Sequence, residues 1–184
     1  YNRIQQLKAL GVSTPNVLAL SKKGILLEDL GSQRQSKVKQ LDQSLARCKD
    51  DIAAKLNLFT QAIQAIQHVH LQGGYLSEAF ARNILVDKDT HFSFIDFETD
   101  PASVLSLHDC YVRDWLLYIF STAYHFKFEQ LSEASQILYR ALLAEPQVYK
   151  DICKVGKRLN WVLRLNVSRV GNDGKRCLLY TSPS

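Results

Sequence analysis

The longest periodic stretch of the chain lies between residues 41 and 71. Its apolar residues recur at spacings of three, four or seven, a pattern that places them on one face of an amphipathic helix. The members of this stripe are Leu45, Ile52, Leu56, Phe59, Ile63, Ile66 and Val69. Gly73 and Gly74 follow the stripe, and glycine favours helix termination. We therefore expect one long helix over residues 41–71.

Helical patterns return in the second half of the chain. Residues 109–124 are strongly apolar and predict a buried helix. Residues 129–144 predict an amphipathic helix, which Glu145 and Pro146 end. Residues 148–170 predict a basic helix pair or one broken helix.

Short apolar runs bounded by turn residues predict strands near the start of the chain. Residues 17–20 and 24–30 form two such runs with a turn between them. A helix over residues 1–10, ended by Gly11, precedes them. Residues 32–39 are polar and without apolar period, so we expect a linker there.

A second hairpin is predicted further along the chain. Its runs are residues 84–86 and 92–95, with a turn at 87–90 between them. Asn83 opens the first run and Asp96 closes the second. Carboxamide and carboxylate oxygens suit a hard cation such as Mg²⁺, especially one that also touches phosphate. The alternative is a hairpin whose two ends are merely polar. With the helices around it, this order predicts an α+β fold whose second part is mostly helical.

Three further polar residues lie within helical patterns. Asp114 falls inside the apolar helix, and we expect it to be hydrogen-bonded because an unpaired buried acid is costly. His68 and His70 are two residues apart, so they point to different faces and cannot share one metal ion. We interpret both as surface or helix-end histidines.

Composition narrows the class of protein. The chain has 184 residues, of which 46% are hydrophobic and 22% charged, as expected of one globular domain. The formal net charge is +5, but the basic residues are dispersed rather than clustered. Nucleic-acid binding usually requires a clustered basic face, so an anionic small substrate or a membrane surface is favoured over nucleic acid.

Cysteine usage and the lack of targeting signals indicate a cytoplasmic protein. Cys48, Cys110, Cys153 and Cys177 form no C-x-x-C pair. We interpret them as buried or incidental thiols in a reducing compartment. The chain contains neither a recognisable signal peptide nor an apolar run of transmembrane length.

The two ends of the chain carry unusual features. Methionine is absent and Tyr1 lies within a predicted helix, so we expect a truncated N-terminus. Residues 177–184 resemble translated adaptor read-through, which would make them a non-native tail. The alternative is an ordinary frayed terminus.

Five motifs, in order, resemble the protein-kinase-like phosphotransferase superfamily. Residues 26–31 resemble its hinge strand, and 69–73 its L-H-x-x-G segment. Asn83 fits the catalytic-loop Asn, and Asp96 opens a D-F-E that fits D-F-G, thirteen residues later. Asp114 resembles the buried Asp that holds the catalytic loop. The resemblance spans about residues 1–170 and is closest to the bacterial lipopolysaccharide or Kdo kinase group.

This resemblance implies a lobe organisation and a nucleotide site. Residues 1–31 would be a remnant of the small lobe with the hinge, and residues 32–176 the large lobe. ATP and Mg²⁺ are the implied cofactors. The implied metal ligands are Asn83 and Asp96. The implied nucleotide-binding residues are Glu28 and Leu30, through backbone groups at adenine, and Leu85, as the floor of the pocket.

The chain departs from the family pattern at its catalytic loop. Glu78 stands where the family has its catalytic Asp, and Leu76 where it has His. Glu78 is either a weak base that orients the nucleophile or a residue without a catalytic role. The family's Gly-rich loop, strand lysine and helix glutamate would precede Tyr1, and Lys22 and Lys23 lie in a turn. We therefore expect weak nucleotide binding and slow phosphoryl transfer.

The implied activity is transfer of the ATP γ-phosphate to a hydroxyl, such as one on a lipopolysaccharide-core sugar at the inner membrane. Five basic residues could face an anionic or lipid-linked acceptor, or simply form a solvated helix face. They are Lys154, Lys157, Arg158, Arg164 and Arg169. One alternative is a pseudokinase that binds or regulates without transferring phosphate. Another is an aminoglycoside- or choline-type phosphotransferase. These patterns specify no oligomeric state.

Overall fold

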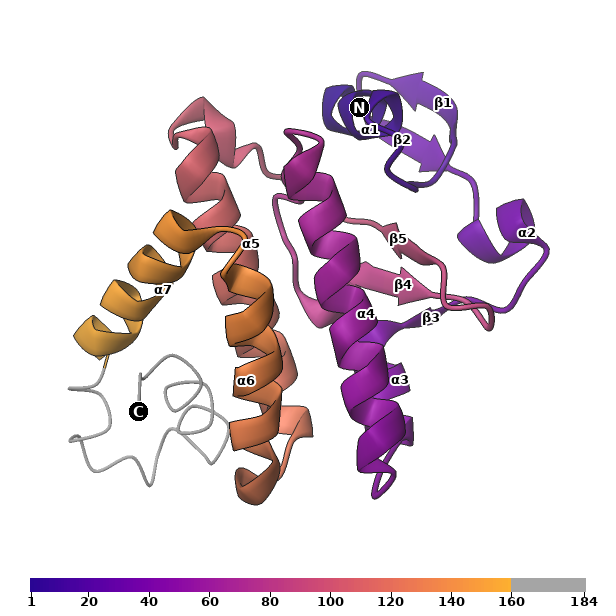
Figure 1. Cartoon of the computed structure of the whole chain (residues 1–184). Helices are drawn as coiled ribbons and strands as arrows, with labels where there is room; N and C mark the ends of the chain where they lie inside the picture. The colour runs from indigo at the N-terminus through magenta and orange to yellow at the C-terminus, as the bar shows by residue number, and fades with distance from the viewer. Residues whose placement is uncertain (160–184) are drawn as a thin grey trace.

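The computed structural model describes residues 1–159 as a mixed α+β fold, mostly helical, with two small antiparallel sheets (Figure 1). Its helices are α1 (Asn2–Ala9), α2 (Leu30–Arg34), α3 (Leu41–Arg47), α4 (Ile52–Leu71), α5 (Leu107–Thr122), α6 (Leu131–Leu142) and α7 (Pro146–Leu159). Its strands are β1 (Val17–Ser21), β2 (Gly24–Leu27), β3 (Lys39–Gln40), β4 (Ile84–Val86) and β5 (Phe92–Phe94). The α+β prediction is confirmed. Several predictions fall outside the described residues. They concern the tail at 177–184, the part of the predicted helical segment 148–170 that follows residue 159, and the residues Arg164, Arg169 and Cys177.

The core forms around α4 and α5. The apolar stripe of α4 is buried through Phe59, Ile63 and Ile66, and α5 contributes the fully buried Trp115 and Tyr118. The rings of Phe59 and Tyr118 stack with centroids 5.4 Å apart. Figure 1 shows α6 beside these helices and α7 crossing near α5. Burying such aromatic side chains supplies much of the driving force for folding.

The predicted long helix over residues 41–71 is wrong in one respect, because the chain breaks between α3 and α4. Lys49 adopts a positive φ of 39°, which ends α3. Asp51 then caps α4 by accepting a hydrogen bond from the Ala54 amide at 2.9 Å. Lys55 donates to the Lys49 carbonyl at 2.8 Å. These two hydrogen bonds satisfy the Ala54 amide and the Lys49 carbonyl, which the break leaves without helical partners.

The predicted strand over 24–30 and the linker over 32–39 are also corrected. Strand β2 ends at Leu27, and Leu30 begins α2. Asp29 caps this helix by accepting from the Ser32 amide at 2.9 Å, a local signal that outweighs the apolar run. The linker ends in β3, which pairs with β4.

The hairpin of β4 and β5 has the predicted position and polarity. Ile84 pairs with Phe94 in an antiparallel register, and both side chains are buried. Its turn is organised by Asp87, which accepts from Arg34 at 3.0 Å and from the His91 amide at 3.0 Å. Burial alone would raise the pKa of Asp87, but these hydrogen bonds hold that pKa below its usual value. Asp87, Asp89 and His91 also bring their ligand atoms within 4.8 Å of one another, a grouping that the turn itself explains.

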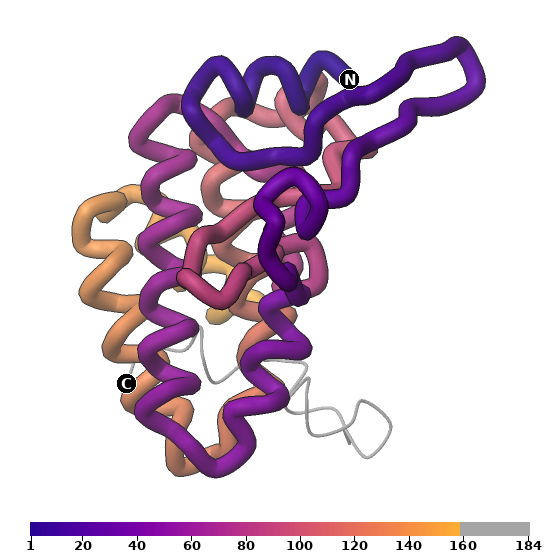
Figure 2. The backbone as a smooth tube through the Cα atoms, turned by 90° about the vertical axis from the view of Figure 1, so that its right-hand side faces the viewer, coloured from indigo at the N-terminus to yellow at the C-terminus, as the bar shows by residue number. Residues whose placement is uncertain are grey.

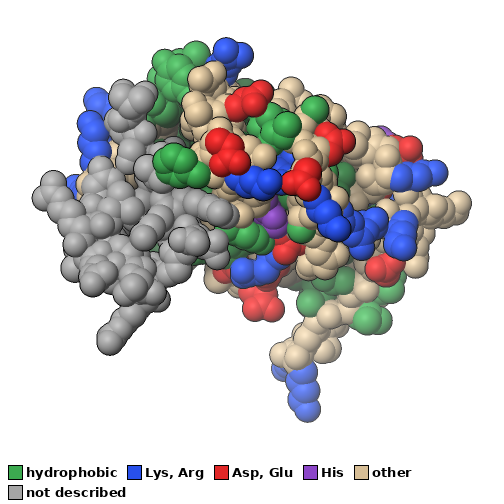
Figure 3. Space-filling view, turned by 90° about the horizontal axis from the view of Figure 1, so that it is seen from below, with side chains coloured by type: hydrophobic (Ala, Val, Ile, Leu, Met, Phe, Trp, Pro, Cys, Tyr) green, Lys and Arg blue, Asp and Glu red, His purple; other side chains and the backbone are tan. Residues whose placement is uncertain are grey.

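The β1–β2 hairpin extends away from the rest of the chain (Figure 2). Its apolar side chains are exposed, among them Leu18 at 60% and Leu26 at 58%. Its turn consists of Lys22 and Lys23, because Ser21 pairs with Gly24. Figure 3 shows a projection with hydrophobic side chains along it and Lys or Arg at its tip. On the face shown there, acidic and basic side chains are otherwise interspersed.

The cysteines of the described part are unpaired. Cys110 is buried, whereas Cys48 and Cys153 are half-buried. Burial raises the pKa of Cys110, which keeps its thiol protonated near neutral pH. Between residues 1 and 159, no helix is long and apolar enough to cross a membrane.

Candidate functional site

The loop between α4 and β4 is held in place by one buried carboxylate. Asp114 on α5 is fully buried, and its Oδ2 accepts from the Leu76 amide at 2.6 Å. Leu76 is itself buried, so the hydrogen bond anchors the loop to the core. The prediction that Asp114 is hydrogen-bonded is confirmed. Tyr111 on the same helix donates to the His70 carbonyl at 3.1 Å, which fixes the end of α4 beside this loop.

His70 lies in the last turn of α4, so its interpretation as a helix-end histidine holds, but its side chain is buried rather than at the surface. His68 is exposed, as expected. The His70 ring lies between two carboxylates. Its Nε2 is 3.3 Å from Asp114 Oδ2, and its Nδ1 is 3.1 Å from Glu145 Oε2. Both contacts can be hydrogen bonds only when both ring nitrogens carry protons. Burial alone would lower the pKa of His70, but its hydrogen bonds to Asp114 and Glu145 outweigh burial and raise that pKa above its usual value.

Asn83 and Asp96 are brought together at one end of the β4–β5 hairpin. Asn83 ends the single helical turn Ala81–Asn83 before β4, and Asp96 follows β5. The Ile95 amide donates to the Asn83 carbonyl at 3.0 Å, which extends the pairing of the strands. Asn83 Nδ2 donates to Asp96 Oδ2 at 3.1 Å. Asp96 adopts a φ of +68°, a conformation that Asp tolerates better than most residues.

The oxygen atoms of this pair form a suitable donor set for a hard cation. Asn83 Nδ2 also donates to the Glu78 carbonyl at 3.1 Å, so the amide nitrogen is fully used. Within the described residues, no hydrogen bond occupies Asn83 Oδ1. A carboxamide oxygen and a carboxylate beside each other match the few protein ligands that Mg²⁺ takes when phosphates supply others. The residues present therefore fit the implied ion.

Glu78 lies next to this pair through its backbone only. Its side chain is 20% exposed, and Oε1 lies 3.9 Å from Arg113 Nη2. The Thr99 hydroxyl donates to the same oxygen at 3.4 Å. The Glu78 carboxylate therefore lies near Arg113 and accepts a hydrogen bond from Thr99, whereas Asn83 donates to the Glu78 carbonyl.

The residues predicted to contact a nucleotide line one cavity of about 330 Å³. Glu28, Leu30 and Leu85 all contribute to its wall, together with Ile95, the residue before Asp96. The Glu28 amide donates to the Asn16 carbonyl at 2.8 Å, so only the carbonyl of Glu28 is open to a ligand. The Leu30 amide lies at the start of α2, where a helix leaves its first N–H groups without internal partners.

Sequence reasoning missed the partners that organise the site's surroundings. Arg34, which joins α2 to Asp87 of the hairpin turn, lay in a predicted linker. Glu145 was interpreted only as a helix end, yet it contacts His70 at 3.1 Å across 75 positions of sequence. The placement of Glu145 before a proline indicated a turn, and nothing local indicated its partner.

Comparisons of the chain with protein-family models, with curated proteins and with solved structures gave no match.

The raised pKa of His70 predicts a pH-dependent stability. A group whose pKa is higher in the folded state stabilises the fold fully below its unfolded pKa, about 6.5 for histidine, and loses this contribution as pH rises through the folded pKa. We expect the free energy of unfolding to fall as pH rises above this value. Urea denaturation across neutral and mildly alkaline pH measures it. His70→Gln should flatten the pH dependence, and an unchanged slope in this variant would contradict the assignment.

Proposed function

We propose that this chain is a kinase-like unit that binds ATP with Mg²⁺ and takes part in phosphoryl transfer to a hydroxyl group. The observation that carries the proposal is the pairing of Asn83 with Asp96, joined at 3.1 Å beside the cavity lined by Leu85 and Ile95. A cavity with both apolar and polar walls, next to hard oxygen ligands, provides both parts of a metal–nucleotide site. The fold class and the motif order support it further.

The cavity has the features needed for a planar base. Leu85 on β4 presents an apolar side chain to its floor, and the Leu30 amide and Glu28 carbonyl offer one donor and one acceptor at its edge. Its volume of about 330 Å³ is at the lower end of the range for small-molecule sites. These groups would bind and orient the base, and the metal-binding pair would hold the phosphate end.

Bound Mg²⁺ would supply charge neutralisation on the phosphates. The residues of the chain would position this charge: Asp96 with a carboxylate, Asn83 with its amide oxygen. Asp114 supports the arrangement indirectly, because it anchors the loop that carries Glu78. An acceptor hydroxyl on an anionic, lipid-linked sugar at the inner membrane is part of the proposal, supported by the exposed Lys154, Lys157 and Arg158 on α7.

The contacts of Glu78 favour a second candidate, a unit that binds nucleotide without transferring phosphate. A general base must reach the proton that it removes. The Glu78 carboxylate is instead engaged by Thr99 and lies near Arg113. This arrangement corresponds to the pseudokinase alternative, in which the same site serves binding or regulation.

Calorimetric titration of the full chain with ATP tests the proposal. We expect binding with Mg²⁺ and much weaker binding with excess chelator. Leu85→Trp should abolish binding because the larger side chain fills the cavity floor. Leu18→Trp is the matched control, since Leu18 is 60% exposed on the distant hairpin, and it should bind normally. Binding that ignores Mg²⁺ or survives Leu85→Trp contradicts the proposal.

The same preparation distinguishes the two candidates through phosphate release from ATP. Phosphoryl transfer with Glu78 as the base predicts slow release by the parent chain and a loss of this activity in Glu78→Gln. The binding-only candidate predicts unchanged nucleotide affinity and no release by either protein.

A further inference from the structure

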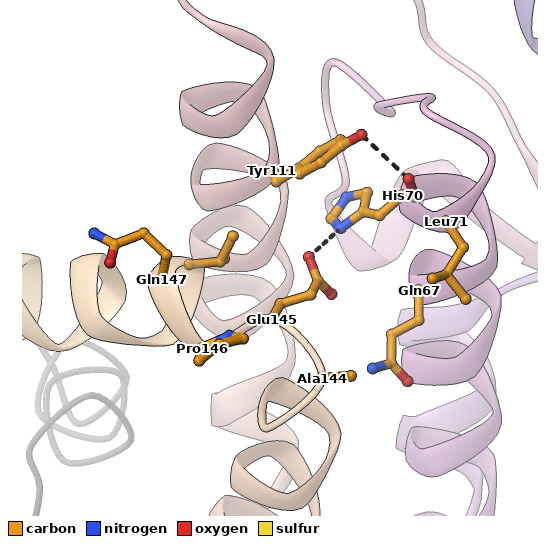
Figure 4. A pocket seen from close by; sticks show the side chains of 9 residues that line it. Gln67, His70, Leu71, Tyr111, Ala144, Glu145, Pro146 and Gln147 are labelled. Carbon is orange, nitrogen blue, oxygen red and sulfur yellow. Dashed lines mark hydrogen bonds and ion pairs between the residues drawn. The ribbon is translucent and has the colours of Figure 1, made fainter.

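A second cavity, of about 300 Å³, lies between the end of α4, the start of α5 and the turn that joins α6 to α7 (Figure 4). Its walls are largely apolar. Leu71, Tyr111, Pro146 and Val148 supply them. It shares no lining residue with the cavity that contains Leu85, so it is a separate site.

One end of this cavity is polar and carries an unused acceptor. Figure 4 shows His70 and Glu145 pointing toward each other from α4 and from the α6–α7 turn. Glu145 Oε2 lies 3.1 Å from His70 Nδ1. The other oxygen, Oε1, is buried and has no hydrogen-bond partner among the described residues. A buried carboxylate oxygen without a partner is costly, and a donor from a ligand would relieve this cost.

The charged groups at the polar end of the cavity favour one kind of hydrogen-bond donor in a ligand. The polar cluster consists of Glu145, Asp114 and His70. Two carboxyl groups face a single imidazole ring, so the positive charge of His70 is shared between Asp114 and Glu145, and the further cation Arg3 acts on Asp114. A cationic donor therefore gains more at Glu145 than a neutral one, because it adds Coulombic attraction to the hydrogen bond.

We propose that this cavity binds a small amphipathic amine. Its apolar body would lie against Leu71, Tyr111 and Val148, and its ammonium group would donate to Glu145 Oε1. A single aromatic ring with a short aminomethyl arm is of suitable size for about 300 Å³.

The cavity is connected to the loop that carries Glu78. Glu145 contacts one nitrogen of His70, and Asp114 Oδ2 contacts the other at 3.3 Å. The same Asp114 oxygen accepts from the Leu76 amide at 2.6 Å. A ligand that binds Glu145 should therefore change the chemical shift of the Leu76 amide, although Leu76 does not line the cavity.

Titration of the ¹⁵N-labelled full chain with benzylamine tests this inference by NMR. We expect saturable shifts at the amides of Gln67, Leu71 and Val148, and a smaller one at Leu76, with a Kd of about 1 mM for a ligand of this size. Benzyl alcohol, which keeps the ring and loses the charge, should bind about tenfold more weakly. Equal binding of the two probes overturns the assignment of Glu145 as the recognition group.

Two variants of cavity residues and one surface control distinguish binding in this cavity from binding elsewhere on the protein. Glu145→Gln should weaken benzylamine binding about tenfold by removing the charge while keeping a hydrogen-bond acceptor. Ala144→Trp, at an exposed position on the cavity's edge, should abolish binding by filling the cavity. Glu133→Gln, an exposed acid on α6, should leave binding unchanged. The absence of saturable shifts in the parent chain, or their persistence in Ala144→Trp, overturns the proposal.

Discussion

Replacing Asp114 by Ala is expected to lower the free energy of unfolding by about 3 kcal/mol, the usual cost of removing one member of a buried polar pair. Asp114 is fully buried, and its Oδ2 serves both the Leu76 amide and His70. Its loss leaves a buried N–H without an acceptor and a buried histidine with one carboxylate fewer. Each of these defects costs free energy on its own. Chemical denaturation monitored by circular dichroism gives the value.

Two further variants sharpen this measurement. Asp114→Asn keeps an acceptor for the Leu76 amide and removes the charge that faces His70, so it should lie between the parent and Asp114→Ala. Glu133→Ala removes an exposed carboxylate from α6 and should change stability by less than about 0.5 kcal/mol. A loss in Asp114→Ala as small as in Glu133→Ala would show that Asp114 does not anchor the loop.

Replacing Asp96 by Ala is expected to weaken Mg²⁺-dependent ATP binding by about a hundredfold or more. Removing even an outer partner of a metal ligand typically costs ten- to a hundredfold in affinity, and Asp96 is proposed as a direct ligand. The substitution also removes the acceptor for Asn83 Nδ2, which is held at 3.1 Å. Asn83 would then be free to turn its amide away. Titration calorimetry with ATP, in the presence and absence of Mg²⁺, measures the loss.

A matched control lies in the same hairpin. Asp89 is an exposed carboxylate in the turn between β4 and β5, so Asp89→Ala makes the same chemical change away from the site. It should leave ATP affinity unchanged. If Mg²⁺-dependent binding survives Asp96→Ala, or if Asp89→Ala reduces it equally, the role assigned to Asp96 is wrong.

The elements defined by local patterns were predicted well. The β4–β5 hairpin forms from the two predicted apolar runs, with Asn83 before it and Asp96 after it. The apolar helix around Asp114 also forms as expected. Both follow from the spacing of apolar residues within a few turns or strand repeats, which depends on neighbouring positions alone.

The errors in element boundaries have a local cause. The stripe from Leu45 to Val69 continues across the break at Lys49, so periodicity suggested one helix. Asp51 and Asp29 were both available as helix caps, but capping and periodicity compete, and the sequence pattern alone did not show which would prevail. Tertiary contacts also favour the capped helices, because Lys55 of α4 donates to the His125 carbonyl and Arg34 of α2 donates to Asp87.

Local sequence patterns predicted the α+β class, the β4–β5 hairpin with Asn83 and Asp96 at its ends, and a hydrogen-bond partner for Asp114. They did not predict the break between α3 and α4, helix α2 or strand β3. The packing of distant segments placed His70 between Asp114 and Glu145 and brought the side chain of Glu78 to Thr99, and no local pattern indicated either contact. The physical reason is sequence separation. Periodicity and capping act between near neighbours, whereas these contacts join positions that only the packing of helices and strands brings together.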